Sequence, residues 1–455
     1  MVRILITQEE DYSMSHMMKG SNLEVKMDEK VPLSEGLTLG LQHALSMNVY
    51  VGPMIIAGMI GLSSAETTGV IQSTFIASGL AMILQTLLMK LPVAQGASFI
   101  PIAALSGISM VHGGGMAGWS VAMTASLIGA LVLLLVGFTG FVDKLIHHFI
   151  PHFVGSVIVL CIGLSLMPAA VGNIYHAPNG SVGQNLTLGM LTVAVMVICS
   201  LLGEKVTGLF GKVLRIGSVL LTFIVGCVVA YFMGILDASV VGQADWVSLP
   251  LFLGKDIQFT FDGSSVLTVL IVYLLLLSES AGTWIAMANT CETSLTTETI
   301  NKGVIGEALS CVISSIFGTS PMTGFSSNAG IICLTKVASR QVFVLGGALL
   351  FVFGLSGKLS ALISVIPGAV IGGIFLVICG TIFMGGLQSI DYKKMCTSKG
   401  TFVVILPVAT IALLQYIPQD FLNQLPEVLK YFLGSPVSVA SLLAIVLNKA
   451  IPEKE

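Results

Sequence analysis

GTSPMTGFSSNAGIICLTKVASR, residues 318–340, interrupts an otherwise apolar part of the chain. Gly, Pro, Ser, Thr and Asn supply most of residues 318–330, and strongly apolar runs lie on both sides. Such a composition disfavours a continuous helix. Non-helical backbone is tolerated at membrane depth only where it is buried in protein or lines a watery cavity. This segment therefore predicts a broken membrane span that lines a binding cavity.

The composition of the whole chain indicates a membrane protein. Of its 455 residues, 55% are hydrophobic and 9% are charged, whereas soluble domains average about 25% charged residues. Apolar runs of spanning length, near 20 residues, recur along the chain. We therefore expect an all-α polytopic membrane protein. No basic cluster occurs, so we expect no nucleic-acid partner; the net charge of −3 does not bear on this.

The apolar runs predict fourteen transmembrane segments. If the N-terminus lies inside, 17 of the 20 Lys and Arg residues fall on cytoplasmic segments and only Lys255, Lys358 and Lys430 fall outside. This distribution agrees with the positive-inside rule and predicts cytoplasmic termini in a cell-membrane protein. The predicted spans lie near 35–61, 66–91, 94–110, 115–138, 146–169, 185–203, 214–235, 264–289, 303–317, 321–335, 342–357, 361–385, 401–417 and 432–449.

Two pairs of segments suggest an internal repeat. IPHFVGSVIVLCIGLSLM (150–167) is similar to IPGAVIGGIFLVICGTIFM (366–384), and QGASFIPIAALSGI (95–108) holds the same place in its half as GTSPMTGFSSNAGI (318–331). Both offsets are about half the chain. Seven segments per repeat is an odd number, so the two halves would insert with opposite orientation. This is the inverted-repeat plan of many secondary transporters.

The paired broken spans predict a binding site. A half-helix that begins inside the membrane directs free N–H groups and its positive dipole end into a cavity. Extended backbone before it offers N–H and C=O groups to a planar heterocycle. We expect residues 318–330 and 95–101 to form the two halves of this site. The alternative, a glycine-rich helix-packing face, does not explain Pro321.

Two acidic residues lie within predicted spans. Glu279, in LLLLSESAGTWIAMANT, is near the middle of its span, where an acidic side chain is by default a functional-site hypothesis. It could bind a proton or accept two ring N–H groups from a substrate; a structural carboxyl is the alternative. Glu307 lies near a helix start, and a structural role is more strongly favoured there. His43 is deep in the first span, as either a structural or a relay group. Thr283 shares the helical face of Glu279.

The motifs resemble those of the nucleobase–cation symporter 2 family, also called the nucleobase–ascorbate transporters or xanthine/uracil permeases. The resemblance covers roughly residues 30–450. Its most specific part is TGFSSNAGIICLTKVASR (323–340), and LGLQHALSM (39–47), QGASFIPI (95–102) and LSESAG (277–282) also carry it.

The resemblance implies fourteen segments in two inverted seven-segment repeats, with short strands in segments 3 and 10 and the substrate between them. It also implies a core domain and a gate domain that rock against each other, and a homodimer in membrane lipid. The boundaries that we expect are a tail at 1–31, core at 32–138, gate at 139–262, core at 263–357, gate at 358–449 and a tail at 450–455.

The family roles transfer position by position. Glu279 matches the carboxylate that grips the base, and Glu307 and His43 match positions linked to proton coupling. Backbone near Ser98 and Phe99 matches the stacking and amide contacts of segment 3. The expected substrate-binding residues are Glu279, Ser98, Phe99, Ile100, Ser326, Ser327, Asn328 and Thr283, and the expected proton-coupling residues are Glu279, Glu307 and His43.

Three positions depart from the family pattern. Relatives have Glu or Gln where this chain has Ser327, and often His or Asp where it has Thr283. Pro101 lies near the place where the segment-3 strand offers an N–H, which proline lacks. The shorter Ser327 leaves more room, which favours a purine or an oxidised purine over uracil. These departures leave Glu279 to hold the proton nearly alone, with Glu307 assisting.

These observations predict a proton-coupled importer of a xanthine- or urate-like purine that needs no cofactor. The alternatives are a transporter of the same fold for uracil or another small planar or anionic solute, with Na⁺ coupling or none, and a membrane-embedded enzyme. An anion would be repelled by Glu279, and no catalytic constellation is visible. We therefore do not expect an enzyme. The eight cysteines occur without metal-ligand spacing, so we expect no metal site.

Overall fold

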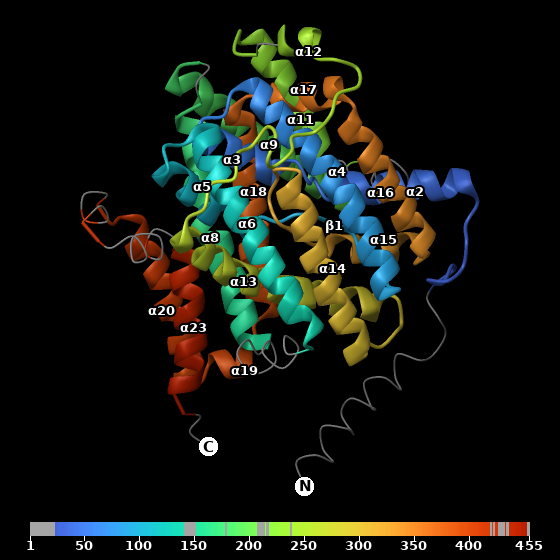
Figure 1. Ribbon diagram of the computed structural model, residues 1–455, viewed down its shortest axis with the longest axis vertical. Coiled ribbons are helices and arrows are strands. Elements are labelled where there is room, and N and C mark those ends of the chain that lie inside the picture. The colour runs from blue at the N-terminus through green and yellow to red at the C-terminus, as the bar shows by residue number, and fades with distance from the viewer. Residues whose placement is uncertain are drawn as a thin grey trace.

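The computed structural model describes residues 23–452 apart from 141–151, 178–179, 207–213, 215–217, 237–238, 419–420, 422–423, 426–432 and 434–435. This part of the chain is almost entirely helical (Figure 1), with one two-stranded sheet. Its helices are α2 (Leu33–Ser46), α3 (Val51–Ile60), α4 (Ser64–Met89), α5 (Ile102–Val111), α6 (Gly115–Phe138), α8 (His152–Tyr175), α9 (Val182–Lys205), α11 (Ser218–Phe232), α12 (Ser239–Gln243), α13 (Gly263–Thr290), α14 (Thr297–Ile316), α15 (Ser327–Thr335), α16 (Arg340–Leu355), α17 (Gly357–Ser364), α18 (Gly368–Ser389), α19 (Tyr392–Met395), α20 (Ser398–Gln415) and α23 (Pro436–Ala450).

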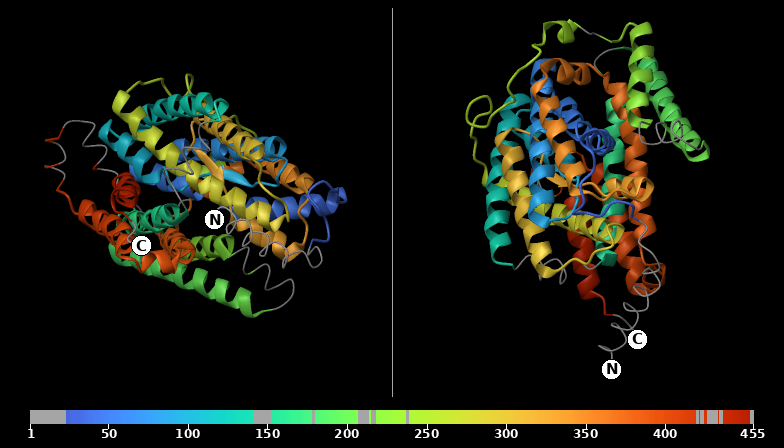
Figure 2. Two further views of the ribbon diagram at one scale, coloured as in Figure 1. Left: turned by 90° about the horizontal axis from the view of Figure 1, so that it is seen from below. Right: turned by 90° about the vertical axis from the view of Figure 1, so that its right-hand side faces the viewer.

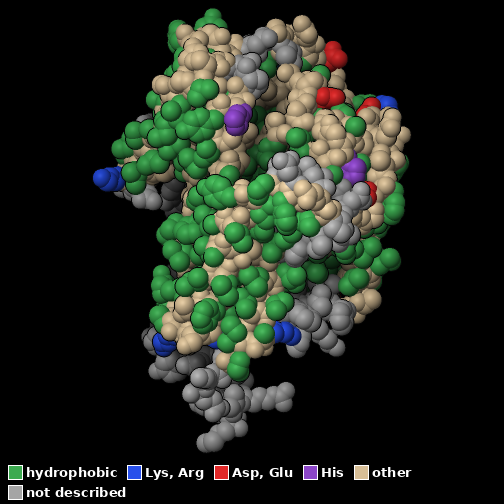
Figure 3. All heavy atoms as spheres, turned by 90° about the vertical axis from the view of Figure 1, so that its left-hand side faces the viewer, with side chains coloured by type: hydrophobic (Ala, Val, Ile, Leu, Met, Phe, Trp, Pro, Cys, Tyr) green, Lys and Arg blue, Asp and Glu red, His purple; other side chains and the backbone are tan. Residues whose placement is uncertain are grey.

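The helices confirm a polytopic membrane protein. Within the described residues, eight helices are long and apolar enough to cross a membrane, or nine if the bent pair α16–α17 counts as one span. Figure 3 shows a flank covered mainly by hydrophobic side chains, with few charged ones. This surface suits contact with lipid. The total of fourteen segments stays a prediction.

Two predicted spans have different boundaries in the structure. The run 35–61 is interrupted between α2 and α3, where Asn48 has a φ of 49°. The run 361–385 is divided between α17 and α18, because Pro367 precedes α18 and proline cannot continue a helix from the preceding turn. Hydropathy averages over both breaks, so it could not show them.

Both α13 and α14 begin at side-chain caps. Asp262 accepts a hydrogen bond from the Ser265 N–H at the start of α13, at 2.7 Å. Burial alone would raise the pKa of Asp262, but hydrogen bonds from Ser265 and Ser264 outweigh it and hold the pKa below its ordinary value. Thr296 caps α14 by accepting from the Thr299 N–H. α14 therefore begins earlier than the predicted boundary at 303, since its first turns are polar.

The helices pack as two sets, which lie side by side in Figure 2. In the first helix set, α4 packs on α14 and α16, α6 packs on α5, α13 and α14, and α2 packs on α16. In the second helix set, α18 packs on α8, α9 and α11, and α20 packs on α23 and α8. Between the sets, α3 contacts α8 and α18, and α13 contacts α8 and α23. Segments from both halves of the chain thus contribute to each set.

Two short strands lie inside the first helix set, and both are fully buried. β1 (Gln95–Ala97) pairs antiparallel with β2 (Met322–Gly324), with Gln95 opposite Gly324 and Ala97 opposite Met322. β1 packs on α4, and β2 packs on α13 and α14. Each strand leads within a few residues into a short helix, α5 or α15. The pair brings two segments more than 200 residues apart to one place.

Glycines allow close approach of helix backbones in both sets. A Cβ on Gly79 of α4 would lie 2.5 Å from the Gly347 carbonyl oxygen of α16. In the second set, a Cβ on Gly163 of α8 would lie 2.4 Å from the Phe383 nitrogen of α18. Small residues at such crossings are typical of membrane helix packing. The two segments that suggested a repeat, 150–167 and 366–384, therefore pack against each other.

We predict that Gly79→Ala lowers the melting temperature of the detergent-solubilised protein, because the added methyl group forces α4 and α16 apart at a cost of about 1–3 kcal/mol. The matched control is Gly380→Ala in α18, where no described atom lies within 4 Å of the added Cβ. We expect this control to melt at or slightly above the parent temperature. Equal shifts in both variants would contradict the packing argument.

Candidate functional site

Glu279 lies on α13 beside the end of β1. The Ser98 hydroxyl donates to Glu279 Oε2 at 3.1 Å. Ser98 also accepts from the Ile100 N–H at 3.1 Å and donates its own N–H to the Pro321 carbonyl at 2.9 Å. One serine therefore links the carboxylate, the turn into α5 and the segment before β2. The turn therefore uses the Ile100 N–H, since the neighbouring Pro101 has none to donate.

Glu307 lies on α14 and is completely buried. Ser280 donates to its Oε1 at 2.5 Å, and the Gln95 amide donates to its Oε2. Ser310 in turn donates to Gln95 Oε1 at 3.3 Å, and Ser280 hydrogen-bonds with the Thr323 hydroxyl at 3.0 Å. Both oxygens of Glu307 are thus occupied by protein donors, and the network joins both strands to α13 and α14.

The sequence analysis did not identify three of these partners, Gln95, Ser280 and Thr323. Ser280 directly follows Glu279, and Gln95 opens the QGASFIPI segment. Polar side chains at apolar depth require a buried partner, so the sequence indicated that Gln95 and Ser280 form hydrogen bonds. It did not indicate that their partner is Glu307, which lies on another element.

His43 and Asn328 meet where α2 approaches α15. His43 Nδ1 and Asn328 Oδ1 are 2.6 Å apart, and the Ser46 hydroxyl donates to the same Asn328 oxygen at 3.4 Å. The His43 ring also packs on Phe343, with 4.3 Å between the ring centroids. The Asn328 amide nitrogen is buried and has no hydrogen-bond partner among the described residues. It is therefore a donor available to a ligand.

The remaining predicted site residues differ in their surroundings. The Thr283 hydroxyl donates to the Gly324 carbonyl at 3.1 Å, so it fastens β2 to α13. Ile100 is buried, whereas Ser326 is exposed and makes no side-chain cap for α15. Ser327 begins α15, but its side chain lies outside the described part of the structure.

Phe99 lies at the boundary of the two helix sets. Its ring stacks on that of Phe375 from α18, with 6.3 Å between the centroids and 23° between the planes. Phe99 belongs to the turn between β1 and α5, whereas Phe375 belongs to the second set. A planar ligand stacked on Phe99 would therefore be near side chains of both sets. Aromatic faces of this kind suit a heterocycle.

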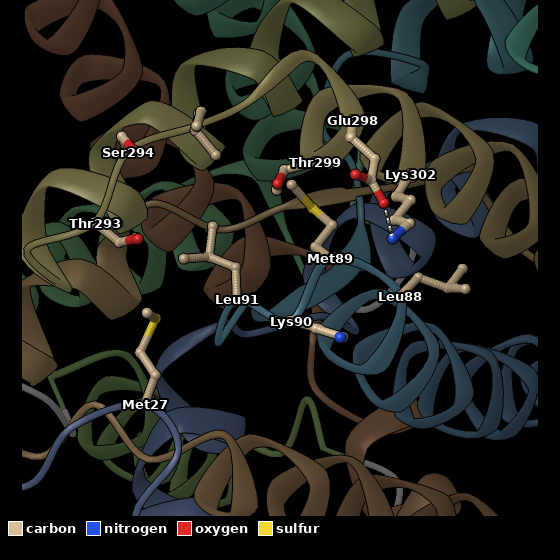
Figure 4. A pocket seen from close by; sticks show the side chains of 11 residues that line it. Met27, Leu88, Met89, Lys90, Leu91, Thr293, Ser294, Glu298, Thr299 and Lys302 are labelled. Atoms are coloured by element: carbon tan, nitrogen blue, oxygen red, sulfur yellow. Dashed lines mark hydrogen bonds and ion pairs between the residues drawn. The ribbon is translucent and has the colours of Figure 1, made fainter.

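A pocket of about 310 Å³ lies elsewhere, at the ends of α4 and α13 and the start of α14 (Figure 4). It contains an ion pair between Lys302 and Glu298 at 2.5 Å, and the hydrogen bond from Lys302 lowers the pKa of Glu298 below its ordinary value. None of the predicted site residues lines it. The pocket is therefore separate from the residues around Glu279 and Asn328. The lining residues are Met27, Leu88, Met89, Lys90, Leu91, Thr293, Ser294, Leu295, Glu298, Thr299 and Lys302.

Solved structures share this fold at low sequence identity. The transmembrane domain of the cyanobacterial bicarbonate transporter BicA has a TM-score of 0.58 and 13% identity, and the match covers 93% of this chain and all of that one. The murine Slc26a9 anion transporter in the inward-facing state has a TM-score of 0.62 and 12% identity, over 92% of this chain and 69% of that one. These likenesses establish a transporter fold and nothing about the solute.

Sequence relatives are permeases and transporters, not enzymes. The uric acid permease PucK of Bacillus subtilis (strain 168) is 29% identical, over 92% of this chain and 96% of its own length. The xanthine permease of the same strain is 29% identical, over 90% of this chain and 92% of its own length. The xanthine permease XanP of Escherichia coli (strain K12) is 28% identical over 96% of both chains.

Residues 34–418 match the permease family. The match covers the strand pair, the half-helices α5 and α15, and the carboxylates of α13 and α14. The chain therefore belongs to the permease family of xanthine and uracil permeases, the nucleobase–ascorbate transporters.

Proposed function

We propose that this protein imports a xanthine- or urate-like purine across the cell membrane by proton symport. The observation that carries the proposal is the presence of a carboxylate acceptor, Glu279 on α13, and an unpartnered amide donor, Asn328 on α15, on two helices that contact each other. Oxidised purines present ring N–H donors beside carbonyl acceptors, so they match both groups. The printed names of the relatives, which include uric acid and xanthine permeases, support the same substrate class.

Glu279 is the residue that we assign to substrate binding and to the proton. Its carboxylate can accept two N–H groups, and one of its oxygens already accepts the Ser98 hydroxyl. Glu307 is enclosed by Ser280 and Gln95, and we assign it a supporting role in proton coupling. His43 holds the Asn328 oxygen and so orients the free amide nitrogen.

We infer that transport proceeds by alternating access. The first helix set would act as the core domain, which carries the site, and the second as the gate domain. The Phe99–Phe375 contact between the sets supports this division, since rocking of one set against the other would separate these rings. The bias of Lys and Arg supports cytoplasmic termini. We also propose a homodimer, as the family resemblance implies.

Two alternatives follow from particular observations. By their titles the fold neighbours are a bicarbonate transporter and an anion transporter. An ionised Glu279 would oppose any anion, urate in its anionic form included, unless a proton is bound at the site as well. A smaller base such as uracil is the second alternative, and coupling to Na⁺ or to no ion is the third. Direct uptake measurements separate them.

The proposal is tested by uptake of radiolabelled xanthine, urate, hypoxanthine, guanine, adenine and uracil into cells that lack their own permeases. We expect uptake of xanthine or urate that collapses when a protonophore is added and survives replacement of Na⁺. Uptake that persists with the protonophore would overturn proton symport. Uptake of uracil alone would overturn the purine assignment. Failure to take up any base, with normal abundance in the membrane, would overturn the function as a whole.

We predict that Glu279→Gln lowers purine uptake at low substrate concentration by about 100-fold, because each hydrogen bond to a charged group contributes about 1.5–3 kcal/mol. The matched control is Glu35→Gln, an exposed carboxyl in the first turn of α2. The control should transport at the parent rate. Immunoblots of the membrane fraction would verify equal abundance, and unchanged uptake by Glu279→Gln would exclude this residue from the site.

A double-mutant cycle tests the contact between His43 and Asn328. Asn328→Ala should raise KM for the purine at least about tenfold, as the loss of a substrate hydrogen bond requires. His43→Ala should raise KM less, because the amide nitrogen remains but is no longer oriented. The double variant should resemble Asn328→Ala, with a coupling of about 0.5–3 kcal/mol. Additive effects would show that His43 acts independently of Asn328.

A further inference from the structure

Residues 23–31 lie against the connection between α15 and α16, although the sequence predicted a polar tail over 1–31. Residues 1–22 of that predicted tail are outside the described part of the chain. We call residues 23–31 the strap, and residues 336–340, between the end of α15 and the start of α16, the joint. The joint is the last part of LTKVASR (334–340), the end of the segment in which the family resemblance is most specific.

Backbone hydrogen bonds join the strap to the joint. The N–H groups of Glu24 and Val25 both donate to the Lys336 carbonyl, at 2.9 and 3.2 Å. In return, Ala338 donates to the Val25 carbonyl at 2.9 Å and Arg340 donates to the Met27 carbonyl at 3.0 Å. Val25 and Val337 form a parallel bridge. The strap thus adds to the joint as one short strand adds to another.

Side chains extend the same contact. The Ser339 hydroxyl, which is fully buried, donates to the Glu29 carbonyl at 2.5 Å. Arg340 pairs with Asp28, and Lys336 pairs with Glu24 at 3.5 Å. The carboxylate partners of these ion pairs are largely exposed, with 78% and 70% of the side-chain surface accessible. Exposed ion pairs contribute little to stability, so the backbone hydrogen bonds and the Ser339 hydrogen bond provide most of the free energy that holds the strap on the joint.

The joint follows α15, a helix that is too short to be stable on its own. α15 has nine residues, fewer than an isolated helix needs to persist. Lys336 ends it in the left-handed region, at a φ of 58°. Asn328 lies about two helical turns before this cap. Whatever fixes the joint therefore also fixes the direction in which α15 presents Asn328 to His43.

We propose that the strap is a positioning element for substrate binding, which holds the joint and thereby keeps Asn328 in its binding orientation. The role of Asn328 in binding rests on the proposed function. In this proposal the LTKVASR segment both ends α15 and binds the strap. Met27 of the strap also lines the pocket in Figure 4, so the strap spans from the joint to the end of α4.

The first test compares two deletions and two point variants in the full transporter. Deletion of residues 2–30 removes nearly the whole strap, whereas deletion of 2–22 removes none of the contacts described. Val25→Pro removes the N–H that donates to Lys336, whereas Val25→Ala keeps it. A looser joint would lower the fraction of transporters in which α15 holds Asn328 in its binding orientation. The apparent affinity for the purine would fall in proportion to that fraction. We expect Val25→Pro to raise KM about fivefold, the factor of one net hydrogen bond, and deletion of 2–30, which removes several hydrogen bonds, to raise it at least as much. Their maximal rate per transporter and the two controls should stay near the parent values.

The second test does not depend on transport. Hydrogen–deuterium exchange of the purified variants should become faster within α15 after deletion of 2–30, beyond the direct loss of the Ala338 and Arg340 hydrogen bonds to the strap, while α5, the other half-helix, keeps its parent rate. Unchanged exchange within α15 would overturn the proposal, and so would equal acceleration in α5, which indicates general loosening. If the parent chain takes up no purine, the proposed function fails, and the exchange comparison still decides the role of the strap.

Discussion

The antiparallel pairing of β1 with β2 is the interaction on which the rest of the structure depends. Extended backbone in a membrane interior needs internal partners for its N–H and C=O groups. Three-residue strands cannot supply them alone. Here the two strands satisfy each other, and the Thr283 and Ser280 hydroxyls bond the backbone of Gly324 at the end of β2. The strand ends then fix where α5 and α15 begin, and with them the places of Ser98 and Asn328.

The two carboxylates of α13 and α14 differ in exposure and in surroundings: Glu307 is completely buried, whereas Glu279 is only partly buried. Glu307 receives Ser280 on one oxygen and Gln95 on the other. Its network reaches Thr323 through Ser280, so it ties the strand pair to two helices. Removal of either partner would leave a buried group unsatisfied, which is costly. Glu279 is held by the Ser98 hydroxyl at the end of β1, which is the position from which a carboxylate can address a ligand.

The sequence predicted the membrane class, the two broken segments and the acidic residues, because these depend on local composition. The cluster of Gly, Pro, Ser, Thr and Asn at 318–330 predicts a break in the helix, whereas single glycines also occur inside helices such as α4 and α8. The partners of each polar group could not be predicted in this way. That Gln95 meets Glu307, and that His43 meets Asn328, follows from packing of segments more than 200 residues apart. The break between α2 and α3 was also invisible, since its residues are apolar on average.

The low identity to the fold neighbours indicates which features carry specificity. At 12–13% identity the bicarbonate and anion transporters share the arrangement of helices, so that arrangement alone does not select a solute. Selection must come from the few side chains around the strand ends. In this chain these supply a carboxylate, a free amide donor and the Phe99 ring. A small inorganic anion could accept a hydrogen bond from the amide but would be repelled by an ionised carboxylate, whereas a planar base with both N–H and carbonyl groups could use all three. In the proposed function, Glu279 is therefore the residue that we expect to restrict the solute most.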